Sequence, residues 1–67
     1  PAWTVSTRSL HDGTTIVSVR SDHGEERIRE IPATLQGEAL AAELRAARAD
    51  AQARADELNR LEDAAKR

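Results

Sequence analysis

Two histidines and two aspartates are the residues of this chain whose types could bind a metal ion. They lie in the segment HDGTTIVSVRSDHG, with His11 and Asp12 near one end and Asp22 and His23 near the other. Imidazole nitrogens and carboxylate oxygens are common zinc ligands, and each must lie within about 2.1 Å of the ion. Whether such a site can form therefore depends on the elements that hold these four residues.

The residues between the two groups have the pattern of a β-strand, which holds the histidines apart. Residues 14–21 read TTIVSVRS and are rich in β-branched side chains. A strand rises by about 3.3 Å per residue, so His11 and His23 can be ~35–40 Å apart. One chain then cannot bring both to one ion, and the sequence predicts two turns and no metal site.

Two further segments also alternate with the two-residue period of a strand. Trp3, Val5 and Thr7 fall on one face of the first, and residues 26–31, ERIREI, form the other. Short strands joined by tight turns favour an antiparallel β-meander over residues 2–31.

The first turn is typical of a three-residue hairpin loop that ends in a left-handed glycine, here Gly13. This loop places apolar residues opposite each other on one face of the sheet. The expected pairs are Leu10 with Thr14, Thr7 with Val17, Val5 with Val19, and Trp3 with Ser21.

The second turn allows two registers. Pairing Val19 with Ile28 and Ile16 with Ile31 keeps apolar residues together and uses a two- or four-residue loop around His23 and Gly24. A three-residue loop would instead set Arg20 opposite Glu26. We favour the hydrophobic register, because burial of apolar residues specifies strand register strongly.

Four arginines share the face opposite Trp3 in the favoured register. A flat face of this kind could bind phosphates or an acidic protein partner, or it could be an ordinary solvated sheet face. No aromatic residue lies on it to stack on nucleic-acid bases. This candidate partner-binding face consists of Arg8, Arg20, Arg27 and Arg29.

The second half of the chain predicts one long helix over residues 35–66. Pro32 should end the third strand because it cannot donate to the ladder, and Thr34 can cap the helix. Beyond Gly37, strong helix formers dominate, with no further glycine or proline. The helix should begin at Leu35 or just after Gly37, and it should be about 45 Å long.

A seam of small and apolar residues runs along this helix at alternating spacings of four and three, the spacing of a coiled coil. A strand of this sheet spans only about 25 Å, so we expect a second copy to cover the rest of the helix. An amphipathic helix lying on its own sheet is the alternative. The predicted oligomer interface is Leu40, Leu44, Ala47, Ala51, Arg54, Leu58, Leu61 and Ala65.

An antiparallel helix pair suits this seam better than a parallel pair. A parallel pair would set Arg54 against its own copy, at a desolvation cost. An antiparallel pair can set Leu44 against Leu61, and it lets the Arg54 stem lie on Ala51 while the guanidinium reaches water. We therefore expect an antiparallel homodimer.

Composition excludes several classes of protein. The net charge is −2 and the chain has no cysteine, so nucleic acid is an unlikely partner and thiolate chemistry is absent. No apolar run could span a bilayer, so we expect a cytoplasmic protein without a membrane partner. The amine of Pro1 could act as a base, as in one tautomerase class, but the order of elements does not follow that class.

These observations predict an α+β fold in one small domain, residues 1–67: a three-stranded antiparallel β-meander followed by one long C-terminal α-helix. No phosphate loop or nucleophile elbow is found, and we expect no enzyme activity, catalytic residue or cofactor. The predicted function is a small oligomerisation or adaptor protein that acts through protein–protein contacts. The alternative is a small dimeric nucleic-acid-binding regulator that uses the arginine face.

Overall fold

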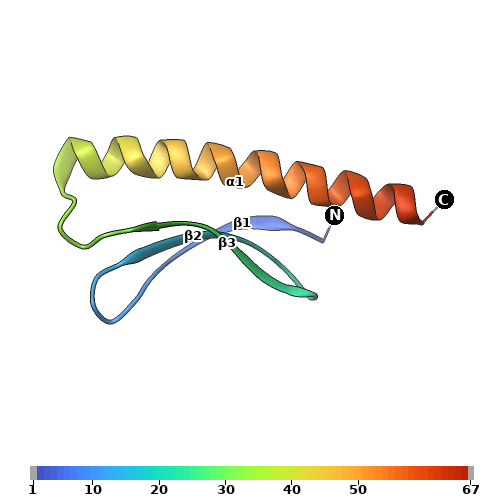
Figure 1. Cartoon of the computed structure of the whole chain (residues 1–67), viewed down its shortest axis with the longest axis horizontal. Coiled ribbons are helices and arrows are strands. Elements are labelled where there is room, and N and C mark those ends of the chain that lie inside the picture. Colours follow the sequence, from blue (N-terminus) through green and yellow to red (C-terminus); the bar gives the residue numbers. More distant parts are fainter. Residues whose placement is uncertain (1, 67) are drawn as a thin grey trace.

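The computed structural model describes residues 2–66, which form an antiparallel sheet followed by one long helix. The elements are β1 (Thr4–Ser9), β2 (Thr15–Ser21), β3 (Gly24–Ile31) and α1 (Gly37–Ala65). The strand order is β1-β2-β3, so β2 is central. The helix α1 lies along one face of the sheet (Figure 1). The predicted order of a meander followed by a long helix is confirmed.

The first hairpin has the predicted register. Val5 lies opposite Val19 and Thr7 opposite Val17. The Leu10 amide donates to the carbonyl of Thr14, and the Gly13 amide donates to the carbonyl of Leu10. Gly13 has φ +89°, in the left-handed region. The residues of the turn and the apolar pattern of the strands favour the same register here, and the sequence was therefore sufficient to predict it.

The second hairpin differs from both registers considered for it. Ser21 pairs with Gly24 across a two-residue loop, and Val19 then lies opposite Glu26, not Ile28. The register shifts between Val17 and Ser18, because β3 carries one extra residue, Ile28, at a β-bulge. The hydrophobic register was wrong: a bulge turns the strand locally and sends the residues beyond it to the other face.

The helix begins later than Thr34 would require. Gln36 is the N-cap residue, without a side-chain hydrogen bond, so the predicted Thr34 cap is wrong. The Leu35 amide instead donates to the Pro32 carbonyl in a turn. Gly37 has φ +58°, a conformation that a side chain disfavours. This glycine is therefore needed where the chain turns into the helix.

The core lies between α1 and the sheet. Its large side chains are Val17, Val19 and Ile31, and each is almost completely buried. On the helix, Ala47, Ala51 and Ala55 recur every fourth residue and are also fully buried. Residues four apart share one helix face, and their small side chains let the helix backbone approach the strands closely.

The sheet supports more of the helix than strand length alone suggested. The Trp3 amide donates to Asn59 Oδ1 at 2.9 Å, and Asn59 Nδ2 donates to the Trp3 carbonyl at 3.1 Å. Leu58 packs against the core, whereas Leu61 is 60% exposed. The start of β1 lies beside the C-terminal half of α1 (Figure 1). Only the last turns of the helix therefore extend past the sheet.

We predict that a side chain at position 13 destabilises the fold. Gly13→Val places a β-branched residue at φ +89°, and an added Cβ would lie 2.9 Å from the Ala33 Cβ. Denaturant unfolding should show a loss of about 1–3 kcal/mol. In a cycle with Gly13→Ala, the change Ala33→Gly should recover the part of the loss due to this contact. Unchanged stability of Gly13→Val would contradict the turn geometry.

Candidate partner-binding surfaces

The face of the sheet away from α1 carries three of the four predicted arginines. Thr4, Arg20 and Glu25 lie side by side across the strands, as do Ser6, Ser18 and Arg27. Directly opposed residues in an antiparallel sheet share a face. This outer face therefore holds Arg8, Arg20 and Arg27, together with Glu25 and Glu30.

Arg29 lies on the other face, against the helix. Its guanidinium donates to Glu43 at 2.7 Å and also to Asp50. The bulge at Ile28 is the physical reason, because it shifts the alternation of β3 by one residue. The structure therefore does not bring the four predicted arginines together.

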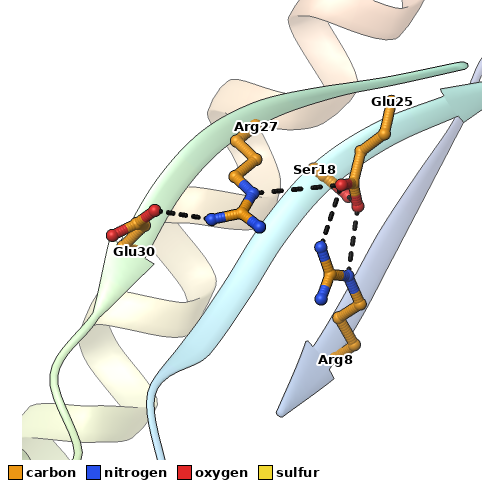
Figure 2. A network of polar contacts seen from close by, with 5 residues as sticks. All are labelled: Arg8, Ser18, Glu25, Arg27 and Glu30. Carbon is orange, nitrogen blue, oxygen red and sulfur yellow. Dashed lines mark hydrogen bonds and ion pairs between the residues drawn. The ribbon is translucent and has the colours of Figure 1, made fainter. Parts of the chain in front are cut away.

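Glu25 is the centre of a polar network on the outer face (Figure 2). Its carboxylate accepts two hydrogen bonds from Arg8, at 2.9 and 3.2 Å, and one from the hydroxyl of Ser18 at 3.0 Å. The hydrogen bonds from Arg8 and then Ser18 lower the pKa of Glu25 from 4.5 to about 2. The same contact raises the pKa of Arg8. This network joins all three strands.

The remaining charges of the outer face are also largely matched. Arg27 Nη1 contacts Glu30 at 2.9 Å, and Arg27 Nε lies 3.9 Å from Glu25. Within residues 2–66, Arg20 is the arginine of this face that forms no ion pair with a carboxylate. Ile16 lies in register between Arg8 and Glu30 and is fully buried. Ion pairs and hydrogen bonds thus connect the strands across the outer face and leave it little free positive charge.

The histidines and aspartates of the opening segment lie at the turns. Asp12 Oδ1 accepts a hydrogen bond from the Thr14 amide, which lowers the pKa of Asp12. His23 Nε2 lies 3.3 Å from Glu62 of the helix and 3.9 Å from Asp22. Among the described residues, no group of three potential ligands could hold a metal ion. Pro1 lies outside the described residues.

An open hollow of about 620 Å³ lies beside the first turn and is lined by residues 8–12. His11 and Asp12 are among the lining residues, and the Asp12 carboxylate accepts a hydrogen bond from the Thr14 amide. A nucleophile–base pair requires two side chains within hydrogen-bonding reach of each other. The hydrogen bonds of the described residues place no such pair in this hollow.

Most of the predicted helix seam faces the sheet of its own chain. Ala47 and Ala51 are fully buried there, and Leu40, Leu44 and Leu58 pack against the same core. Leu61 and Ala65 are exposed. The alternative of an amphipathic helix on its own sheet therefore describes six of these eight residues, because Arg54 also contacts β3. Pairing with a second copy stays a prediction.

Arg54 contacts the sheet, whereas the sequence suggested a contact with a second helix. Its Nε donates to Glu26 Oε2 at 2.6 Å and its Nη2 donates to Glu26 Oε1 at 3.0 Å. The hydrogen bonds from Arg54 lower the pKa of Glu26, and those to Glu26 and Glu57 raise the pKa of Arg54. The sequence predicted neither this pair nor the burial of Ala55, although Ala47, Ala51 and Ala55 recur at a four-residue spacing that indicates one helix face.

The free edge of β1 is a surface that the sequence analysis did not identify. The Leu10 amide donates to Thr14 across the hairpin, and hydrogen-bonded pairs alternate along an antiparallel ladder. The backbone groups of Val5, Thr7 and Ser9 therefore point away from β2, to the open side. Trp3 has the same orientation, but Asn59 satisfies both its backbone groups.

The helix flank above this edge carries Arg48. Its Nη1 donates to Thr7 Oγ1 at 2.7 Å, and both side chains belong to exposed residues. Arg48 forms no ion pair with a carboxylate of residues 2–66, unlike Arg29 and Arg54 on the side of β3. The open edge of β1, from Val5 to Ser9, therefore lies beside an uncompensated positive charge.

The chain shows no match to the known proteins with which it was compared, whether family models, curated proteins or solved structures. Within the described residues, α1 is too polar to cross a membrane as a helical span.

We predict that acid weakens the outer-face network. The pKa of Glu25 is about 2 in the folded chain, below its usual value of 4.5, so its stabilising contribution is complete above pH 4.5 and is lost as the pH falls toward 2. Chemical unfolding from pH 7 to 2 should show a smaller loss of stability below pH 4.5 in Glu25→Gln and in Arg8→Gln. Parallel losses in both variants and the wild-type chain would contradict this assignment.

Proposed function

We propose that this protein is a small non-enzymatic interaction module that acts through protein–protein contacts at the free edge of β1. The observation that carries the proposal is the difference between the two edges of the sheet. The edge strand β3, GEERIREI, has five charged residues among its eight, whereas β1, TVSTRS, has one. That single charge, Arg8, is engaged by Glu25.

Unpaired strand edges are templates for pairing with another chain, and proteins commonly protect them with charged side chains. The charges of β3 protect one edge in this way. On β1, Asn59 binds the edge at Trp3, and no group of residues 2–66 hydrogen-bonds to the outward backbone groups of Val5, Thr7 and Ser9. An added strand would obtain its affinity from these main-chain groups.

Self-association is the other form of this function. An antiparallel helix pair through Leu44 and Leu61 has weak support, because Leu44 packs on the sheet of its own chain. A second copy could instead pair its β1 with this β1. Both arrangements are homodimers, and they expose different amides to solvent.

The alternative function, a nucleic-acid-binding regulator, has weaker support. Arg8 and Arg27 contact Glu25 and Glu30, and Arg29 contacts the helix. Phosphate binding by the first two would have to compete with carboxylates in the same plane. Such binding would also decline steeply with salt.

Affinity capture with matched baits tests the proposal. Thr7→Pro removes an amide hydrogen that points to the open edge, a position at which proline is tolerated in edge strands. Proteins that bind the edge should be retained by the wild-type chain and reduced about tenfold or more on Thr7→Pro, since a hydrogen bond is lost and the proline ring obstructs the edge. Thr7→Val retains the amide and is the matched control.

Circular dichroism of all three chains verifies that the fold is intact before capture. Equal retention of the same proteins by the wild-type chain and Thr7→Pro would contradict the proposed use of the β1 edge. Retention that disappears after nuclease treatment would favour the nucleic-acid alternative.

A further inference from the structure

The outward backbone groups of the β1 edge and the charge on its helix side indicate which partner could bind there. Three residues, Val5, Thr7 and Ser9, direct an amide and a carbonyl each to the open side. A partner strand of similar length can pair with all of them. Its side chains would alternate between the helix side and the outer face, because strands have a two-residue period.

The charge beside the middle of this edge is positive, whereas Glu62 lies at its Trp3 end and Asp12 at the first turn. The strand β1 contains no carboxylate, and on the helix flank Arg48 extends to Thr7 without a carboxylate partner in residues 2–66. By contrast, β3 carries Glu25, Glu26 and Glu30. A partner that approaches β1 therefore meets Arg48 on one side and no acidic group of the strand itself.

We propose that the β1 edge binds an extended acidic segment of another protein, which adds as a fourth strand and places a carboxylate against Arg48. This proposal rests on the proposed function and specifies its partner. Thr7 holds the guanidinium over the middle of the edge at 2.7 Å, where a side chain of the added strand would emerge on the helix side. Arginine binds carboxylates well in this setting, because its planar donors form charge-assisted hydrogen bonds.

A second copy is a poorer occupant of the same edge. If two β1 strands paired about Thr7, both Arg48 side chains would lie over the same few residues. Like charges directly opposite each other across strands are destabilising. An acidic strand relieves this positive charge, whereas a second copy doubles it.

Nuclear magnetic resonance titration of the full chain tests the proposal with two matched synthetic peptides, one alternating Thr with Glu and the other alternating Thr with Lys. At millimolar concentration and about 0.15 M salt, where screening acts over about 8 Å, the Glu peptide should shift the amides of Val5, Thr7 and Ser9. The Lys peptide should not. Arg48→Gln should lower the affinity for the Glu peptide about tenfold, because one charge-assisted hydrogen bond is lost.

Arg27→Gln, on the outer face of β3, is the matched control and should leave the affinity unchanged. If both peptides shift the β1 amides equally, the preference for an acidic partner is wrong and the proposed edge function stands. If neither peptide shifts the β1 amides, or if the amides of Arg20 and Arg27 shift and those of β1 do not, the edge function is contradicted as well. Protection of the Thr7 amide in the free chain that is lost on dilution would identify a second copy as the occupant and overturn the acidic partner.

Discussion

The contact between α1 and the sheet is the interaction on which the rest of this structure depends. Burying a valine or isoleucine side chain contributes roughly 1.5–3 kcal/mol. Among residues 2–66, the large side chains buried in this layer are Val17, Val19 and Ile31. The chain has one aromatic residue and no cysteine. The fold therefore requires the helix to approach these strands closely, which the three buried alanines of α1 allow.

Ion pairs between β3 and α1 orient this contact more than they stabilise it. Arg29 connects β3 with Glu43, and Arg54 connects α1 with Glu26. Exposed and half-exposed pairs of this kind contribute about 0–1 kcal/mol each, less than one buried valine. They lie on the β3 side of the helix, so that side is charged and closed, whereas the β1 side retains an open backbone edge beneath Arg48.

The sequence was sufficient where local chemistry and the apolar pattern point to the same structure. The turn ending in Gly13 and the pairing of Val5 with Val19 follow from such agreement. The second register did not follow, because the extra residue at Ile28 leaves no mark in a two-residue alternation. That one bulge moved Arg29 from the outer face to the helix and so divided the predicted arginine face.

The helix shows a second limit of the sequence. Its heptad spacing suits a partner helix and a sheet alike, because both present an apolar surface to one helix face. Tertiary contacts place the helix on its own sheet: Asn59 binds the backbone of Trp3, and Ala55 completes the row of buried alanines. The edge of β1 was also invisible in the sequence, since an open edge depends on which strand is central.

Isotope-filtered nuclear magnetic resonance of a mixture of labelled and unlabelled chains tests most directly whether the helix is buried by its own sheet. The account predicts contacts between the methyl groups of Val17 and Val19 and those of Ala47 and Ala51 within one chain. It also predicts that the spectrum reporting contacts between chains contains none of them. Contacts between the methyl groups of Leu44 and Leu61 in that interchain spectrum would show paired helices and contradict the account.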